Sequence, residues 1–236
     1  MKQNGGYATL GFLNQEVLKV AGPVWKTKTP FASIRRIVQD PRFFFKIRPG
    51  LWALNEYKDK LPFEVQPPKG TPQQDIIELT HSYYQGLLIE IGNLNNLQTA
   101  IPAQDKNKLF LPGRKLGDIA TIKDFHKFSY ENLVRRAQTI DVTWFNNRNM
   151  PDSFFEVEHK TDFINSLLKF VDLRDFNVKF MIVANKVRER EFNSKLSSEA
   201  FQSIKKKVVF LDYDELSEFY SQANEFKPMK KKFSGE

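Results

Sequence analysis

The segment Thr139-Ile140-Asp141-Val142-Thr143-Trp144-Phe145, followed after a polar turn by Ser153-Phe154-Phe155-Glu156-Val157-Glu158-His159-Lys160, decides how the centre of this chain folds. Both runs are rich in β-branched and aromatic residues, so they predict a β-hairpin that turns at residues 146–151. Successive side chains on a strand alternate between its faces, so Glu156, Glu158 and Lys160 share one face. In this hairpin Asp141 lies opposite Glu156.

Three carboxylates therefore converge on one small space. Their repulsion is relieved if a positive charge lies among them, and a divalent cation is the obvious candidate. The alternative is a charged strand at a sheet edge, with Lys160 paired to an acid. Phe154, Phe155 and Val157 favour a covered strand, and therefore the cation site.

The composition indicates a globular protein with one large domain or two small ones. The chain has 236 residues, of which 41% are hydrophobic and 14% aromatic, enough for a core. It has no cysteine, which excludes disulfides and thiolate metal sites. The sequence has no apolar run of about 18 residues and no secretory signal at its start, so we expect a soluble intracellular protein.

Positive charge is concentrated in the first quarter of the chain. Residues 1–60 contain 11 Lys and Arg against 4 Asp and Glu, whereas the remaining residues contain 25 against 24. Clustered positive charge suits a phosphate backbone, although a merely soluble basic surface is the alternative. The stretch 61–72, with four prolines and one glycine, predicts a linker. We therefore expect a DNA-binding domain at 1–60, a linker at 61–72 and a second domain at 73–236.

The N-terminal domain has the pattern of a winged helix-turn-helix. Apolar spacing predicts a helix at 10–21, and Thr29-Pro30 predicts the start of a second helix that runs to Val38. Short strands are expected at 43–47 and 50–54. In this plan the second helix enters a groove of DNA. The candidate DNA contacts are Ser33, Arg35 and Arg36 on this helix, Lys26 and Lys28 before it, and Arg48 at the tip of the wing.

This domain resembles the HARE-HTH family of winged helices, which occur fused to chromatin proteins and to bacterial restriction endonucleases. The similarity covers roughly residues 4–57 and is carried by Gly5-Gly6-Tyr7-Ala8-Thr9-Leu10, Trp25-Lys26-Thr27-Lys28-Thr29-Pro30, Ser33-Ile34-Arg35-Arg36-Ile37 and Phe45-Lys46-Ile47-Arg48-Pro49-Gly50-Leu51-Trp52-Ala53-Leu54. It implies contact with DNA and suggests the sensing of modified bases. A winged helix that binds only protein is the alternative.

The second domain begins with a predicted helix at 71–92, with Glu90 in its last turn among apolar residues. An acid there costs free energy unless a partner or a metal meets it, and the alternative is a glutamate that reaches solvent at the helix end. The further expected elements are a strand at 97–102, a helix at 129–138, the acidic hairpin, a helix at 163–173, a strand at 179–184, a helix at 197–206, a strand at 208–212 and a last helix from about residue 214.

This order resembles the core of the PD-(D/E)XK nuclease superfamily, and most closely type II restriction endonucleases in which a second glutamate replaces the usual lysine. The resemblance implies an α/β (α+β) fold with a mixed sheet flanked by helices. In one register Asp141, Glu156 and Glu158 form the motif. In the other, Glu158-His159-Lys160 supplies it and Glu156 is a neighbour. Hairpin symmetry favours the first, and Glu90 matches an acid that the superfamily often supplies from its first helix.

The expected cofactor is Mg²⁺, because hard oxygen ligands suit this ion. Asp141, Glu156 and the carbonyl of Val157 would hold it, with Glu90 as a further ligand. Glu158 would orient or deprotonate the attacking water, and Lys160 would stabilise charge on the phosphate. The three histidines, His81, His126 and His159, have no ligand spacing, so we expect them to be structural or exposed and not catalytic.

The sequence therefore predicts a Mg²⁺-dependent, sequence- or modification-specific DNA endonuclease of the restriction type. Its partner would be double-stranded DNA, its assembly a homodimer and its location the cytoplasm of a prokaryotic cell. The alternative is a non-catalytic DNA-binding regulator on a degenerate nuclease scaffold. The complete set of acids favours the enzyme.

Overall fold

The computed structural model describes residues 1–20 and 29–234, with side chains up to residue 225. The chain divides into two compact units, one of Met1–Gly70 with Ser217–Glu236 and one of Thr71–Leu216. The first division lies within the predicted linker. The second lies inside helix α8 (Tyr213–Ser234), so the last residues group with the N-terminal unit and not with the predicted 73–236 domain.

The first unit combines short helices with a three-stranded antiparallel sheet of order β1-β3-β2. Its elements are η1 (Lys2–Asn4), β1 (Tyr7–Thr9), α1 (Leu10–Glu16), η2 (Val17–Lys19), α2 (Pro30–Val38), β2 (Phe44–Arg48), β3 (Leu51–Leu54) and η3 (Asn55–Tyr57). The predicted β-hairpin and the second helix are therefore present. The first predicted helix is shorter than expected, because its last turn is a 3₁₀ turn.

A small apolar core holds this unit together. Ile34 and Val38 of α2 pack with Ala8, Leu10 and Leu13. Gly50, with a φ of 79°, makes the tight turn between β2 and β3. The C-terminal segment packs on α1, where Asn14 Nδ2 donates to Ser221 Oγ at 3.2 Å. A Cβ at Gly11 would lie 2.5 Å from Tyr220, so this contact requires glycine.

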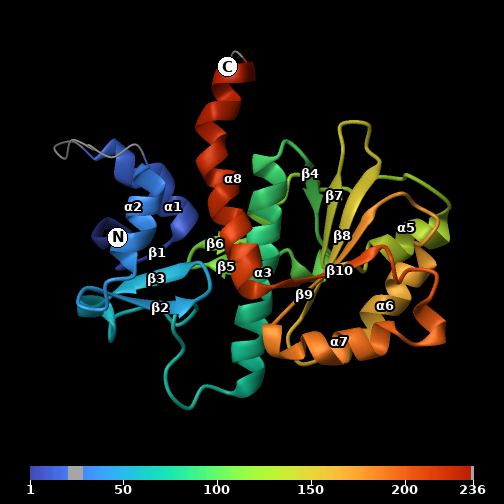
Figure 1. The fold of residues 1–236 in the computed structure, drawn as a ribbon, viewed down its shortest axis with the longest axis horizontal. Coiled ribbons are helices and arrows are strands. Elements are labelled where there is room, and N and C mark those ends of the chain that lie inside the picture. Colours follow the sequence, from blue (N-terminus) through green and yellow to red (C-terminus); the bar gives the residue numbers. More distant parts are fainter. Residues whose placement is uncertain (21–28, 235–236) are drawn as a thin grey trace. The chain divides into compact units, whose positions relative to one another are not determined.

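The second unit is built on a five-stranded mixed sheet of order β10-β9-β8-β7-β4 (Figure 1). Strands β8, β9 and β10 are parallel, and β7 is antiparallel to both β8 and β4. The elements are α3 (Gln73–Leu94), β4 (Gln98–Ala100), η4 (Ala103–Asp105), β5 (Leu109–Leu111), β6 (Arg114–Lys115), α4 (Leu116–Ile119), α5 (Glu131–Ala137), β7 (Val142–Phe145), β8 (Pro151–Glu158), α6 (Phe163–Asp172), β9 (Lys179–Ala184), η5 (Lys186–Arg188), α7 (Glu189–Leu196), η6 (Glu199–Phe201) and β10 (Val208–Asp212).

The central hairpin of β7 and β8 is confirmed. Val142 pairs with Phe155, and one further step in this register brings Asp141 opposite Glu156. The side chain of Asn146 closes the turn by accepting the Arg148 N–H at 2.9 Å, and Asn149 adopts a left-handed backbone with a φ of 59°. Asparagine tolerates both roles, so the polar residues of the turn set the hairpin register.

Helices cover the two faces of the sheet unequally. Trp144 donates its Nε1–H to Leu88 O of α3 at 3.0 Å, which fixes α3 on one face. On the other face Phe154 and Phe180 lie in a core with Phe163, Leu167 and Phe170 of α6. Glu156 and Glu158 alternate with Phe155 and Val157, so they point to the α6 face.

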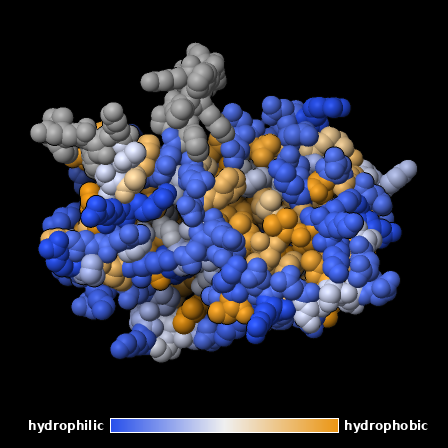
Figure 2. All heavy atoms as spheres, viewed as in Figure 1, coloured by the Kyte–Doolittle hydropathy of each residue, from blue (hydrophilic) through white to orange (hydrophobic). Residues whose placement is uncertain are grey.

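The α3 face stays partly open at the β9–β10 side of the sheet. Met181, Val209 and Leu211 lie on the face away from α6, and Val209 is 52% exposed. Figure 2 shows hydrophobic side chains gathered on this part of an otherwise largely hydrophilic surface. Within the described residues, no helix has the length and apolarity needed to cross a membrane.

The prediction of a helix at 197–206 is wrong. The helix in this region is α7, Glu189–Leu196, and the predicted segment contains only the short η6 followed by turns. Phe201 and Ile204 are buried in the core, and their spacing fits turns as well as it fits a helix. Helix α7 was missed because its sequence is mostly polar, with Phe192 and Leu196 alone buried.

Candidate active site

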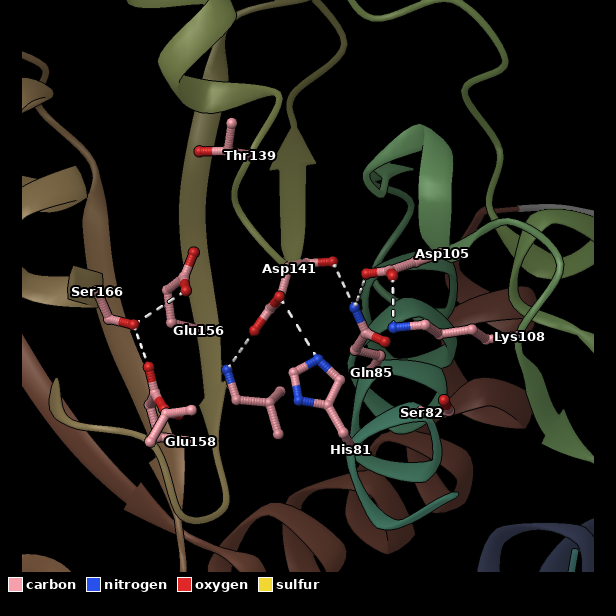
Figure 3. Close-up of polar contacts among 12 residues, drawn as sticks. His81, Ser82, Gln85, Asp105, Lys108, Thr139, Asp141, Glu156, Glu158 and Ser166 are labelled. Carbon is pink, nitrogen blue, oxygen red and sulfur yellow. Dashed lines mark hydrogen bonds and ion pairs between the residues drawn. The ribbon is translucent and has the colours of Figure 1, made fainter. Parts of the chain in front are cut away.

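Asp141 lies just before β7 and is held from two sides. Its Oδ2 accepts the backbone N–H of Val157 at 2.7 Å, and its Oδ1 lies 3.5 Å from Nε2 of His81 on α3. Figure 3 shows the Asp141 carboxylate directed at the His81 ring. The N–H and C=O of one strand residue point to the same side, so the Val157 carbonyl also lies on the side of Asp141. Asp141 thus joins the hairpin to α3.

Glu156 and Glu158 form a buried pair on the α6 face of β8, with exposed fractions of 3% and 6%. Ser166 Oγ of α6 lies 3.0 Å from Glu156 Oε2 and also contacts Glu158 Oε1, as Figure 3 shows. Thr161 donates a further hydrogen bond to Glu158. A hydroxyl has a single proton to donate, so Ser166 can satisfy one of the two carboxylates at a time. A proton or a cation shared by the two acids relieves this.

The lysine of the site is Lys169. Its Nζ lies 2.8 Å and 2.9 Å from the two carboxylate oxygens of Glu156, and 2.8 Å from Thr139 O. Lys160, predicted to share the face of the glutamates, lies beyond the end of β8 at an exposed bend. The alternation that placed it in the site ends with the strand. The sequence did not predict Lys169, because Lys169 lies on a different element from Glu156 and no local pattern shows that α6 packs on this face of the sheet.

Glu90 also lies apart from the acids. It pairs with Arg114 at 2.5 Å. The residue of α3 that reaches the carboxylate of Asp141 is His81, nine residues earlier, or about 13 Å along the helix axis. His81 was expected to be structural or exposed, and it is the α3 side chain that contacts the carboxylate of the predicted ligand. No spacing signal identifies it, because its partner is a distant residue in sequence.

Burial shifts the pKa of all four side chains, and neighbouring charges and hydrogen bonds decide the net direction for two of them. Burial and the nearby charge of Asp141 raise the pKa of Glu156 to about 8, against the opposing effect of Lys169. Burial likewise raises the pKa of Glu158. For Asp141 burial acts upward too, but the charge and hydrogen bond of His81 and the Val157 N–H outweigh it and lower its pKa. Desolvation of His81 is outweighed in the same way by Asp141, so the pKa of the imidazole is raised.

We predict that Glu156 makes the cation-free protein less stable as the pH rises. Its folded pKa of about 8 lies above its ordinary value of 4.5, so the folded state holds a proton that the unfolded state releases. This stabilisation is complete below pH 4.5 and is lost between there and about pH 8. Glu156→Gln removes this titration. The free energy of unfolding of Glu156→Gln should therefore rise relative to that of the wild type as the pH rises across this window, by a few kcal/mol at most.

Denaturant unfolding without divalent cations at several pH values measures this difference. Glu131→Gln is the matched control, since Glu131 is exposed on α5. A difference between Glu156→Gln and wild type that does not vary with pH would contradict the prediction.

A second polar cluster adjoins Asp141 on the α3 side. Among the residues that the structure describes, the one group of three potential ligands with atoms all within 4.8 Å is His81, Asp105 and Asp141. Gln85 Nε2 links this cluster, donating to Asp105 Oδ2 at 2.9 Å and to Asp141 O at 3.2 Å (Figure 3). Lys108 Nζ lies 2.7 Å from Asp105. The acids of this cluster are thus already matched by His81 and Lys108.

The donor types at the hairpin suit a divalent cation, although the three carboxylates do not gather within 4.8 Å of one another as the atoms of His81, Asp105 and Asp141 do. Asp141, Glu156 and Glu158 offer carboxylate oxygens, and the Val157 carbonyl lies on the same side as Asp141. Such an all-oxygen set suits a hard cation. Glu158 is held by hydroxyl groups, so an added positive charge is favourable there. The three carboxylates are less tightly gathered than the sequence predicts, because His81 and Val157 hold Asp141 toward α3.

A family model matches most of the chain. The matching family is the type II restriction enzyme NmeDI C-terminal domain, and the match covers residues 64–235. The chain belongs to this family. In the comparisons with curated proteins and with solved structures, nothing matches this chain. The NmeDI-type match spans Asp141, Glu156, Glu158 and Lys169, so the candidate site lies inside the restriction-enzyme domain.

The NmeDI-type match leaves residues 1–63 uncovered, and these carry the predicted DNA contacts. Lys26 and Lys28 lie outside the described residues. Arg35 faces the C-terminal segment of its own unit, with Nη2 3.3 Å from Glu225. Arg48 donates to Val65 O at 3.1 Å, which ties the end of β2 to the loop after η3. Ser33 is half-buried and donates to Thr29 O. Arg36 is exposed on α2.

Proposed function

We propose that the protein is a Mg²⁺-dependent DNA endonuclease of the restriction type, and that it hydrolyses phosphodiester bonds in duplex DNA. The observation that carries this proposal is the buried Glu156–Glu158 pair beside Asp141 on one hairpin of an NmeDI-type domain. Burial of two acids side by side costs free energy, and a role in metal-assisted phosphoryl transfer would account for it.

Each side chain has a role in the proposed mechanism. Asp141, Glu156 and the Val157 carbonyl would hold the cation, which when bound supplies positive charge that polarises the scissile phosphate. Glu158 would orient a water molecule and take its proton, a task suited to an acid with a raised pKa. The water oxygen forms the new bond to phosphorus as the bond to the leaving oxygen breaks. Lys169 keeps Glu156 in place and adds positive charge near the phosphate.

His81 and Ser166 act as positioning residues in this scheme. His81 and the Val157 N–H fix the rotamer of Asp141, and Ser166 fixes the two glutamates relative to each other. Removal of the shared proton from the glutamates is then coupled to arrival of the cation, because metal ligands must be deprotonated.

The decisive experiment is a plasmid cleavage assay with purified full-length protein, with and without Mg²⁺, on methylated and unmethylated DNA. We expect cleavage that requires Mg²⁺ and stops on chelation. DNA binding without cleavage of any substrate, under all these conditions, would favour the non-catalytic alternative. We also propose a homodimer, because cutting both strands commonly needs two active sites, and light scattering with and without DNA measures this.

The N-terminal unit is proposed to hold DNA through α2, and Arg36 is its best-placed cation. We predict that Arg36→Ala weakens DNA binding and lowers the slope of log K against log salt by about 0.9, the value for one phosphate contact. Arg35→Ala should lower this slope less, because Arg35 already pairs with Glu225. Binding isotherms at several salt concentrations measure both. A slope that Arg36→Ala leaves unchanged would exclude a phosphate contact by this side chain.

A further inference from the structure

A cavity of about 570 Å³ lies in the second unit, outside the acid cluster. Its walls are the end of β4 with the loop to η4, the loop around residue 123, and the end of α5 with the residues that follow it. Its volume is within the range of about 300–1,000 Å³ that is usual for small-molecule sites. The cavity is therefore large enough for a nucleotide-sized group.

The charge of the cavity is positive. Lys106, Lys123 and Arg135 line it, against the single acid Asp124. Lys106 Nζ donates to Lys123 O at 2.9 Å, which joins two of the walls and leaves further N–H groups for a ligand. Arg135 pairs with Glu131 on the exposed surface of α5. Such a set of cations suits a phosphate group.

The rest of the lining suits a nucleobase. Ile101 and Ile122 form buried apolar wall, and the ring of Phe125 is half-buried. The exposed amides of Gln104 and Gln138 supply both donors and acceptors. Bases stack on aromatic rings, and glutamine can bond a base edge.

The cavity adjoins the candidate active site through Thr139. Thr139 lines the cavity, and its carbonyl accepts a hydrogen bond from Lys169, the lysine that pairs with Glu156. In Figure 3 Thr139 lies beyond Glu156, on the side away from Glu158. A DNA strand with its scissile phosphate at the acids can thus place a neighbouring nucleotide at the cavity.

We propose that this cavity receives one unstacked nucleotide of the DNA strand next to the scissile phosphate. The phosphate lies against Lys106, Lys123 and Arg135, and the base lies against Phe125. The inference rests on the proposed nuclease function for its substrate. Unstacking a base costs a few kcal/mol, which contacts in a fitted cavity offset.

Charge variants test the phosphate contact in the full-length protein. Arg135→Ala should weaken binding of a fluorescent duplex by up to about tenfold in anisotropy titrations without divalent cations, with a shallower salt slope. Arg136→Ala is the matched control, because Arg136 is the next residue of α5, also pairs with an acid, Asp172, and does not line the cavity. Equal affinity and equal salt slope in Arg135→Ala and wild type would overturn the proposal.

A blocking variant tests entry of the base. Duplexes carry 2-aminopurine at successive positions, and its emission rises when the base leaves the stack. We expect a rise at one position with wild type and with Ala200→Trp, an exposed site outside the cavity, and its loss with Ala103→Trp, which fills the cavity. No rise at any position with wild type would overturn the proposal.

These outcomes separate the cavity from the chemistry. Cleavage by wild type together with unaltered binding and emission in the cavity variants would leave the nuclease and remove the nucleotide site. Loss of binding and emission in those variants, with no cleavage by wild type, would leave the nucleotide site and remove the nuclease.

Discussion

Asp141→Asn is expected to lower the rate of DNA cleavage by about 10³-fold or more while the protein stays folded. Asparagine retains an oxygen that can accept the Val157 N–H, so the local backbone contact survives. It removes the negative charge that would bind the cation and that holds His81. The loss should therefore appear in the cleavage rate, measured with plasmid DNA and Mg²⁺, and not in DNA binding measured without divalent cations.

Asp118→Asn is the matched control, because Asp118 is an exposed acid in the short helix α4. It should cleave DNA at the wild-type rate. Wild-type cleavage by a folded Asp141→Asn would remove Asp141 from the cation site. An unfolded variant, seen by circular dichroism, would make Asp141 a structural residue instead.

Lys169→Met is expected to lower cleavage by about 10²–10³-fold, whereas Lys160→Met should change it by no more than about twofold. Lys169 pairs with a glutamate that is 3% exposed, so its removal leaves that carboxyl without its cation. Methionine has a similar length and no charge. Lys160 is exposed past the end of β8, where substitution changes little.

Unfolding measurements separate the effects of Lys169→Met on stability and on cleavage. The free energy of unfolding should fall by about 1–3 kcal/mol above about pH 8, where Glu156 is ionised beside Lys169, and by less at lower pH, where Glu156 carries a proton. The reverse ranking of the two lysines, with Lys160→Met inactive and Lys169→Met active, would restore the E-x-K register of the sequence motif.

The local pattern of residues was sufficient for most elements. Strands β9 and β10 have the predicted bounds, and the β7–β8 register follows from the polar turn and the alternation of the two runs. These features depend on residues close in sequence, where side-chain period and turn chemistry act directly. Helix α7 was missed because its polar sequence has a weak apolar period, and only packing on the core makes it a helix.

The residues of the candidate site also fall into two groups, those predictable from neighbouring residues and those that depend on packing. The sequence by itself determined which carboxylates share the hairpin, because strand alternation and register depend on neighbouring residues alone. Only the tertiary structure decided that His81 contacts Asp141, that Lys169 and not Lys160 pairs with Glu156, and that Glu90 binds Arg114. Those partners come from helices packed on the two faces of the sheet, and their meeting depends on how the whole core packs, which no short-range pattern specifies.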